Sequence, residues 1–205
     1  MPPKFLYFDL GKVLIDYSVE RMLGQMAAVA GIAADAVREA VFAGGLMHQH
    51  ETGRLSTREF YEAFCAAAGV RPDYGQLVAA AADIFEPNLT VLPLVAQLQQ
   101  AGYPMGILSN TCEIHWEHCF RRYRIVADGF AVYALSHRIG ALKPDAAIYC
   151  AAAELAGCAP EEIFFVDDIP GHVAGARAVG FDAVQFTTAA ALADELRQRG
   201  IRFNY

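Results

Sequence analysis

The sequence contains no run of Lys or Arg residues, and no apolar stretch in it approaches the length of a membrane span. A membrane-spanning helix needs roughly 20 consecutive apolar residues, and binding to nucleic acid or to anionic lipid relies on clustered positive charge. The formal net charge is instead -7 at pH 7. We therefore expect no nucleic-acid partner and no membrane association, although an acidic protein can still bind a phosphate group locally.

Cysteine is also sparse, with five residues scattered at positions 65, 112, 119, 150 and 158. Their number is odd and most fall within apparent helices, so we expect reduced thiols and no disulfide. Met1-Pro2-Pro3-Lys4 leads directly into an apolar segment of about five residues, which is shorter than the core of a signal peptide. Together these features predict a cytoplasmic protein.

The composition is that of a folded domain without repeats or low-complexity tracts. Apolar residues make up 55% of the 205 positions and charged residues 19%, which excludes a disordered chain. This length allows one medium domain, or a core with a small insert, to bury a sizeable interior.

Strands and helices alternate along most of the chain. Apolar runs predict strands at 5–8, 104–108, 131–134, 163–166 and 182–186, and helical patterns at 92–101, 146–156 and 173–179 end at Gly102, Gly157 and Gly180. Alternation of this kind is typical of a parallel sheet covered by helices, so we predict a three-layer α/β core.

Residues 16–87 differ because they contain helical patterns and no convincing strand. Helices are predicted at 19–30, 34–43, 57–68 and 74–85, and Ser56-Thr57-Arg58-Glu59 supplies a capping box for the third. We therefore predict a core formed by residues 1–15 and 88–205, and a small all-helical cap formed by residues 16–87.

Three carboxylates follow two of the predicted strands. Asp9 comes directly after Phe5-Leu6-Tyr7-Phe8, and Asp167-Asp168 come after Ile163-Phe164-Phe165-Val166. Open α/β sheets bind ligands at the carboxyl ends of their strands, and a set of oxygen ligands suits Mg²⁺. The sequence thus predicts a magnesium site and phosphate chemistry, although each Asp could also simply cap the following helix or turn.

Four short motifs in this order resemble those of the haloacid dehalogenase superfamily. They are Phe8-Asp9-Leu10-Gly11-Lys12-Val13-Leu14, Leu108-Ser109-Asn110-Thr111, Leu142-Lys143-Pro144-Asp145 and Phe165-Val166-Asp167-Asp168-Ile169. The phosphatases of this superfamily have a Rossmann-like core with a helical cap inserted after the first strand. Gly11 and the segment His48-Gln49-His50-Glu51-Thr52-Gly53 more narrowly resemble sugar-1-phosphate phosphatases, such as those acting on glucose 1-phosphate, and the phosphatase domain of epoxide hydrolases.

The resemblance implies a role for each matching residue. Asp9 would be the nucleophile that forms an aspartyl-phosphate, and Asp9, the Gly11 carbonyl, Asp167 and Asp168 would hold Mg²⁺. Lys143 would neutralise charge on the phosphoryl group, and Ser109 with the Asn110 N–H would bind its oxygens. Each of the last residues has a simpler alternative, since Ser109 could cap a helix and Lys143 could be a solvated loop residue.

Gly11 departs from the pattern of most phosphatases in the superfamily, which carry a second Asp two residues after the nucleophile as a general acid and base. General acid–base catalysis contributes about 10² to 10⁴ in rate, so the missing carboxyl must be tolerated or replaced. A good leaving group, such as the anomeric oxygen of a sugar 1-phosphate, would tolerate its absence. His48 or His50 of the cap could replace it and bind substrate, or both could be ordinary surface imidazoles.

Two further positions bear on the site. The helix after Asn110 is expected to direct His115 or Trp116 toward the substrate cleft. His172 could touch substrate, but it is expected to be a solvated loop residue.

We therefore predict a Mg²⁺-dependent phosphomonoester hydrolase that acts on a small phosphorylated metabolite. The alternatives are a metal-independent 2-haloacid dehalogenase, which would not need the acidic pair Asp167-Asp168, and a phospho-ligand-binding protein that turns over poorly. The sequence leaves the substrate open, as it does the choice between monomer and homodimer.

Overall fold

The apolar segment Phe5–Phe8 forms β1, the central strand of a five-stranded sheet in the computed structural model, which describes residues 2–204. The strand order is β5-β4-β1-β6-β7 and all four pairings are parallel, which confirms the predicted fold class. The other four strands are β4 (Met105–Ser109), β5 (Val132–Leu135), β6 (Ile163–Asp167) and β7 (Asp182–Gln185). Because Phe8 pairs with both Ile107 and Val166, the carboxyl ends of β1, β4 and β6 meet at one edge.

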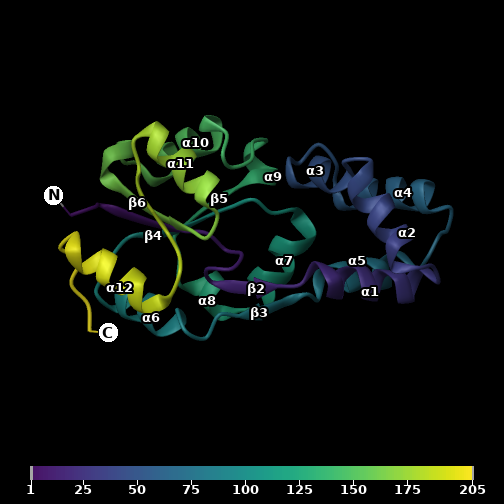
Figure 1. The fold of residues 1–205 in the computed structure, drawn as a ribbon, viewed down its shortest axis with the longest axis horizontal. Helices are drawn as coiled ribbons and strands as arrows, with labels where there is room; N and C mark the ends of the chain where they lie inside the picture. The colour runs from purple at the N-terminus through teal and green to yellow at the C-terminus, as the bar shows by residue number, and fades with distance from the viewer. Residues whose placement is uncertain (1, 205) are drawn as a thin grey trace.

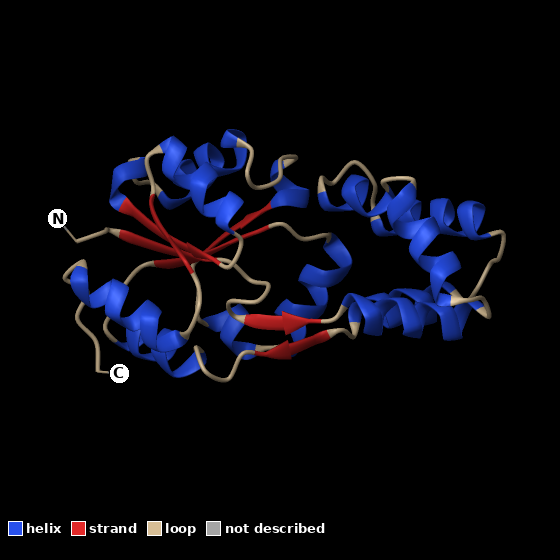
Figure 2. Ribbon diagram, in the orientation of Figure 1, coloured by secondary structure: helices blue, strands red, loops and turns tan. Residues whose placement is uncertain are grey.

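Side chains alternate along β1 between two apolar layers. Phe5 and Tyr7 pack with α10 (Ala146–Ala156) and α11 (Pro170–Val179) on one face. Leu6 and Phe8 pack on the other face against α6 (Leu92–Gln100), α8 (Arg124–Asp128) and α12 (Ala189–Gln198). The core therefore has three layers, with the sheet buried on both faces as parallel sheets are (Figure 2).

The cap lies beyond the carboxyl edge of the sheet (Figure 1). It consists of five α-helices and one π-helical turn: α1 (Val19–Ala30), α2 (Ala34–Arg38), the π-helical turn η1 (Glu39–Ala43), α3 (Leu46–Glu51), α4 (Thr57–Ala68) and α5 (Tyr74–Ala82). Ser56 and Glu59 form the predicted capping box of α4. The cap contacts the core through α3 against α9 (Ser136–Ile139) and α5 against α7 (Glu113–Arg122).

Two short strands that the sequence did not reveal join core and cap. Strand β2 (Ile15–Tyr17) pairs antiparallel with β3 (Phe85–Pro87), so the helix predicted over 74–85 ends instead at Ala82. The predicted boundary at 15/16 falls within β2 and that at 87/88 falls at the end of β3, and as divisions between folding units they stay a prediction. The ribbon brings Tyr17 and Phe85 next to the carboxyl edge of the sheet.

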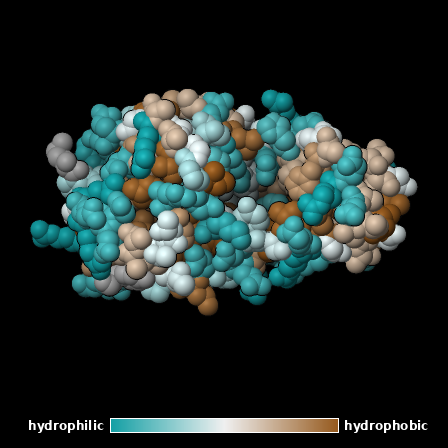
Figure 3. Space-filling view, viewed as in Figure 1, coloured by the Kyte–Doolittle hydropathy of each residue, from teal (hydrophilic) through white to brown (hydrophobic). Residues whose placement is uncertain are grey.

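The molecular surface differs between the two parts. Hydrophilic side chains cover much of the core in the view of Figure 3, whereas apolar surface is prominent on the cap. Within residues 2–204, every helix is too short or too polar to cross a lipid bilayer.

Candidate active site

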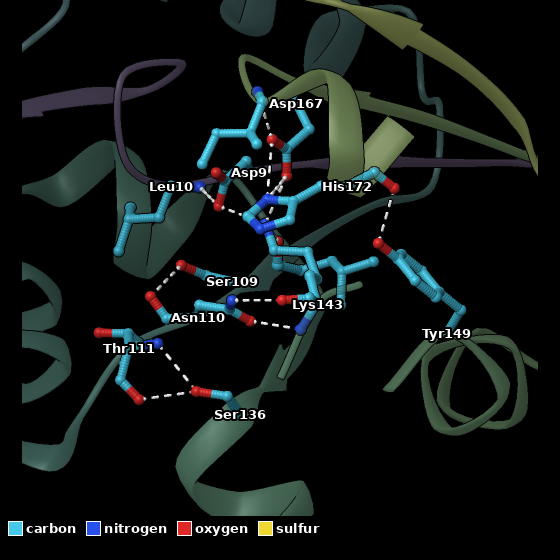
Figure 4. Close-up of polar contacts among 12 residues, drawn as sticks. Asp9, Leu10, Ser109, Asn110, Thr111, Ser136, Lys143, Tyr149, Asp167 and His172 are labelled. Atoms are coloured by element: carbon cyan, nitrogen blue, oxygen red, sulfur yellow. Dashed lines mark hydrogen bonds and ion pairs between the residues drawn. The ribbon is translucent and has the colours of Figure 1, made fainter. Parts of the chain in front are cut away.

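Asp9 is the residue around which the site is built. It follows the central strand, its N–H donates to the Val166 carbonyl at 2.9 Å, and only 6% of its surface is exposed. Its Oδ1 accepts a hydrogen bond from the Leu10 N–H at 2.7 Å and lies 2.9 Å from Lys143 Nζ (Figure 4). Burial raises the pKa of Asp9 to about 6, and the charge of Lys143 opposes this shift.

Lys143 forms ion pairs with the carboxylates at the ends of two strands, Asp9 after β1 and Asp167 in β6. Its side chain is fully buried, and Nζ lies 2.9 Å from Asp9 Oδ1, 2.6 Å from Asp167 Oδ2 and 3.0 Å from the Leu108 carbonyl. One ammonium therefore satisfies three acceptors and offsets the repulsion between two carboxylates. The alternative of a solvated loop lysine is wrong, because the side chain has no solvent contact.

Asn110 positions Lys143 through its side chain. Asn110 Nδ2 donates to the Lys143 carbonyl at 2.9 Å, and Oδ1 accepts from the Lys143 N–H at 2.7 Å. The sequence suggested only the backbone N–H of Asn110, so this clamp was missed. Ser109, at the end of β4, is 2% exposed and lines the cavity, and the residue that caps α7 is Cys112 instead.

Asp167 is held by several donors at the end of β6. It accepts hydrogen bonds from Lys143 and from the Ile169 N–H at 2.8 Å, and His172 Nδ1 lies 3.1 Å from each of its carboxylate oxygens. Burial alone would raise the pKa of Asp167, but these hydrogen bonds outweigh it and lower the pKa. The prediction that His172 is solvated is therefore wrong, because it lies on the first turn of α11 directly against Asp167.

Asp168 has no such set of partners. No other side chain among residues 2–204 donates a hydrogen bond to its carboxylate or pairs with it, and it lines the same cavity as Asp9 and Gly11. Burial, reinforced by the charge of Asp167, raises its pKa.

These donors fit Mg²⁺. Carboxylate oxygens of Asp9 and Asp167 lie within 4.8 Å of each other and of a His172 ring nitrogen, and Asp168 and Gly11 face the adjoining cavity. The Asp167 oxygens already accept hydrogen bonds, whereas Asp168 is free to bind a cation. Oxygen donors are the ligands Mg²⁺ prefers, so Asp9, Asp168 and the Gly11 carbonyl could hold it with Asp167 in support.

A cavity of about 320 Å³ opens over these groups, between core and cap. Its core wall carries Asp9, Ser109, Asn110, Asp168 and His172. The cap wall and the β2–β3 ribbon are mainly apolar and contribute Tyr17, Val19, Met22, Phe42, Met47, Glu51, Ile84 and Phe85. His115 also reaches the cavity, as expected for one of the two aromatic residues proposed on α7, whereas Trp116 is buried elsewhere.

The two cap histidines do not reach this cavity. His48 is exposed on α3, and His50 is 1% exposed and stacks on Phe60 at a ring distance of 4.8 Å. Neither is among the residues that line the cavity. The prediction that His48 and His50 bind substrate or carry its proton is thus corrected, because helix α3 turns both rings away from the site.

Glu51 is the cavity residue that the sequence reasoning missed. It follows Met47 by four positions on α3, so both side chains lie on one helix face and line the cavity. The segment was singled out for its histidines, and no helix was predicted there. A helix prediction over 46–51 would have placed Glu51 on the face of the buried Met47.

The family of the chain follows from comparison with known proteins. A model described as haloacid dehalogenase-like hydrolase matches residues 4–180. The chain belongs to this family. The predicted hydrolase class is therefore confirmed, and the cap and core described above are those of a haloacid dehalogenase-like hydrolase.

Two relatives have detectable sequence similarity, and for the second the fold is also similar. The phosphatase MT3486 of Mycobacterium tuberculosis is 32% identical over 91 residues, which span 44% of this chain and 42% of that protein. A haloacid dehalogenase family enzyme from Bacteroides thetaiotaomicron, solved with magnesium and inorganic phosphate, is 28% identical with a TM-score of 0.80. That match covers 91% of this chain and 95% of the other.

The fold is also shared with an enzyme of different chemistry. The L-2-haloacid dehalogenase from Xanthobacter autotrophicus is 22% identical with a TM-score of 0.63, covering 98% of this chain and 84% of that one. At this identity the likeness shows the fold alone. The choice between phosphoryl and halide chemistry must therefore come from the site.

Proposed function

We propose that this haloacid dehalogenase-like hydrolase is a Mg²⁺-dependent phosphatase acting on a small phosphorylated metabolite. The observation that carries the proposal is the buried Asp9 carboxylate, which faces the cavity beside Asp168 and is paired with Lys143. A halide-displacing enzyme would need the nucleophile Asp9 but not the acidic pair Asp167-Asp168. The magnesium and phosphate bound by the similar Bacteroides enzyme, and the phosphatase from Mycobacterium tuberculosis, support the same chemistry.

In the proposed reaction Asp9 attacks phosphorus and the ester oxygen leaves, giving an aspartyl-phosphate that water then hydrolyses. Lys143 holds Asp9 in place and stabilises negative charge on the transferred group. Ser109 and the Asn110 N–H bind phosphoryl oxygens, since both face the cavity. Bound Mg²⁺, held by Asp9, Asp168 and the Gly11 carbonyl, would neutralise charge on the phosphoryl group.

The cap wall bears on the leaving group. Sugar hydroxyls need polar partners, yet Phe42, Met47, Ile84 and Phe85 present apolar surface to the cavity. A sugar 1-phosphate stays a prediction from the sequence, and the wall favours a second candidate, a monoester whose leaving group has an apolar or aromatic face. The small volume suits a leaving group no larger than a single ring.

A metabolite panel tests the proposal. Phosphate release from sugar 1-phosphates, aryl phosphates and short alkyl phosphates should require Mg²⁺ and disappear with a chelator. Asp9→Asn should lower turnover by at least ~10⁴, because the nucleophile is lost. Asp194→Asn on the exposed surface of α12 should match the wild type. Metal-independent halide release from 2-haloacids would instead favour the dehalogenase, and binding of phosphate without turnover of any ester would favour the phospho-ligand-binding alternative.

A further inference from the structure

The loop after β1 cannot supply the usual acid. A Cβ at position 11 would lie 2.9 Å from Tyr17 Cε1, so the Tyr17 ring fills the space into which a side chain at Gly11 would project. The ring lies 6.3 Å, centroid to centroid, from that of Phe85 on the paired strand β3. If a protein side chain supplies the proton for the leaving group, it must therefore come from another wall of the cavity.

Glu51 is the carboxylate on the opposite, cap-side wall. It is the one Asp or Glu that the described residues of the cap direct into the cavity, and its neighbours there are the apolar Met47 and Phe42. No other residue among 2–204 donates a hydrogen bond to this carboxylate or forms an ion pair with it. Its enclosure raises the pKa of Glu51 to about 7, because burial disfavours the charged form.

The backbone around Glu51 is fixed to the core. The Ser136 hydroxyl lies 2.7 Å from the Glu51 carbonyl and 2.9 Å from the Thr111 carbonyl, and it accepts the Thr111 N–H at 2.9 Å. Two residues later, Gly53 has a φ of +67°, and a Cβ there would lie 2.0 Å from the His137 carbonyl. The end of α3 therefore docks against Thr111, Ser136 and His137, and Glu51 is held near the carboxyl edge of the sheet.

The other titratable groups facing Glu51 come from the core and the ribbon. They are Asp9, Tyr17, Cys112, His115, Asp168 and His172. Burial raises the pKa of Tyr17 and lowers that of His115 to about 4, so the first stays protonated and the second stays neutral near pH 7. His172 is bound to Asp167. None of these groups is as well suited to exchange a proton with the leaving group.

We propose that Glu51 is the general acid and base of this enzyme, replacing from the cap the carboxyl that is missing at Gly11. The inference rests on the proposed phosphatase function. As Asp9 attacks phosphorus and the P–O ester bond breaks, the Glu51 carboxyl gives its proton to the leaving oxygen. The resulting carboxylate then accepts a proton from the water that attacks the aspartyl-phosphate, which releases phosphate, restores Asp9 and leaves Glu51 protonated.

Glu51→Gln tests the inference, because it preserves shape and removes the proton. With magnesium and a short alkyl phosphate, whose alkoxide leaves poorly, kcat/KM should fall by roughly 10²-fold or more. With 4-nitrophenyl phosphate, whose leaving group needs no proton, kcat/KM should change by less than roughly threefold. Hydrolysis of the intermediate should slow, so one equivalent of 4-nitrophenolate should appear in a burst, with phosphorylated protein detectable by intact mass.

Glu62→Gln on the outer surface of α4, where Glu62 pairs with Arg71, is the matched control and should behave as the wild type. Equal activity of Glu51→Gln and wild type on both esters would overturn the inference alone. An equal loss on both esters without phosphorylated protein would assign Glu51 a structural role and overturn it as well. If the wild type hydrolyses neither ester, the phosphatase proposal itself fails.

The wild type provides an independent measurement if the variant does not fold. A general acid must be protonated, so kcat/KM for the alkyl ester should decline above a pH of about 7 while that for the aryl ester does not. Identical pH profiles for the two esters would contradict the proposal.

Discussion

The two walls of the cavity differ in how their charged groups are paired. At the core wall, Asp9, Lys143 and Asp167 form a continuous charged chain, which His172 joins through its contact with Asp167, and Asp168 alone of these carboxylates has no side-chain partner among residues 2–204. On the cap wall, apolar side chains surround Glu51, whose carboxyl has no hydrogen-bond or ion-pair partner among residues 2–204. A network in which every polar group has a hydrogen-bond or ion-pair partner holds its side chains in fixed positions. A carboxyl without such partners can instead interact with a ligand.

This difference separates the tasks of the two walls. The core wall would position a phosphoryl group, which is common to every substrate of such an enzyme. The cap wall would meet the leaving group, which differs among substrates, and residues such as Phe42 can change there without disturbing the charged chain. Replacing a charged residue of the core wall should lower the free energy of unfolding, whereas replacing Glu51 on the cap wall should raise it. Stability measurements can therefore test the comparison.

The largest expected effect is on the core wall. Lys143→Met would leave Asp9 and Asp167 buried without their shared cation, and removing one partner of a buried ion pair costs about 3–5 kcal/mol. Urea unfolding should show this loss in the free energy of unfolding. Lys4→Met is the control, because its pair with Glu162 is largely exposed and exposed pairs contribute about 0–1 kcal/mol. A loss at Lys143 no larger than at Lys4 would show that the charged chain does not stabilise the fold.

On the cap wall we expect a substitution to stabilise the protein. The pKa of Glu51 is raised from 4.5 to about 7, so the folded protein binds this proton more tightly than the unfolded chain. The associated stability is fully present below pH 4.5 and is lost as pH rises through 7. Glu51→Gln removes this dependence, and at pH 8 it should be more stable than the wild type by roughly 1–3 kcal/mol, or several degrees in Tm.

The same pair of proteins supplies the control. At pH 4 the wild-type carboxyl is protonated and resembles the amide, so the two melting temperatures should converge. A difference in melting temperature that is independent of pH would mean that Glu51 is not enclosed as the cavity indicates. Glu62→Gln should show no stabilisation that grows between pH 4 and pH 8, because its side chain is exposed.

The carboxylates of the core wall were largely predictable from the sequence, because short local patterns mark them. The apolar runs that end at Phe8 and Val166 are each followed at once by Asp, and parallel pairing of β1 and β6 brings these ends together. Lys143 was suggested by resemblance only. Its contact with Asn110 joins residues 33 positions apart, and no local pattern encodes a pairing of side chain and backbone over that distance.

The cap wall was less predictable because its position depends on long-range packing. Strands β2 and β3 have three residues each and pair across about 70 positions, so neither periodicity nor length marks them. Helix α3 is only six residues long, and it packs against η1 and α4 of the cap as well as α9 of the core. The sequence therefore drew attention to His48 and His50 by residue type, whereas the fold brings Glu51 to the cavity.

His50 gives the smallest and most local test of this comparison. Both of its ring nitrogens are buried without a hydrogen-bond partner, and its ring stacks on Phe60. An unsatisfied buried polar group costs about 1–3 kcal/mol, so His50→Phe, despite its slightly larger ring, should stabilise the protein by about 1 kcal/mol at pH 7. Urea unfolding would measure this gain.

The gain should grow in acid. Burial lowers the pKa of His50 from 6.5 to about 4, so the unfolded chain binds the proton first and the wild type loses stability as pH falls from 6.5 toward 4. The Phe variant has no such loss, and at pH 5 its advantage should increase by roughly another 1–2 kcal/mol. His48→Gln at the exposed position on the same helix should show no comparable trend. An advantage for His50→Phe that stays constant between pH 7 and pH 5 would mean that the ring has access to solvent or a partner, and that α3 is not seated as tightly as its contacts with Phe60 and Ser136 require.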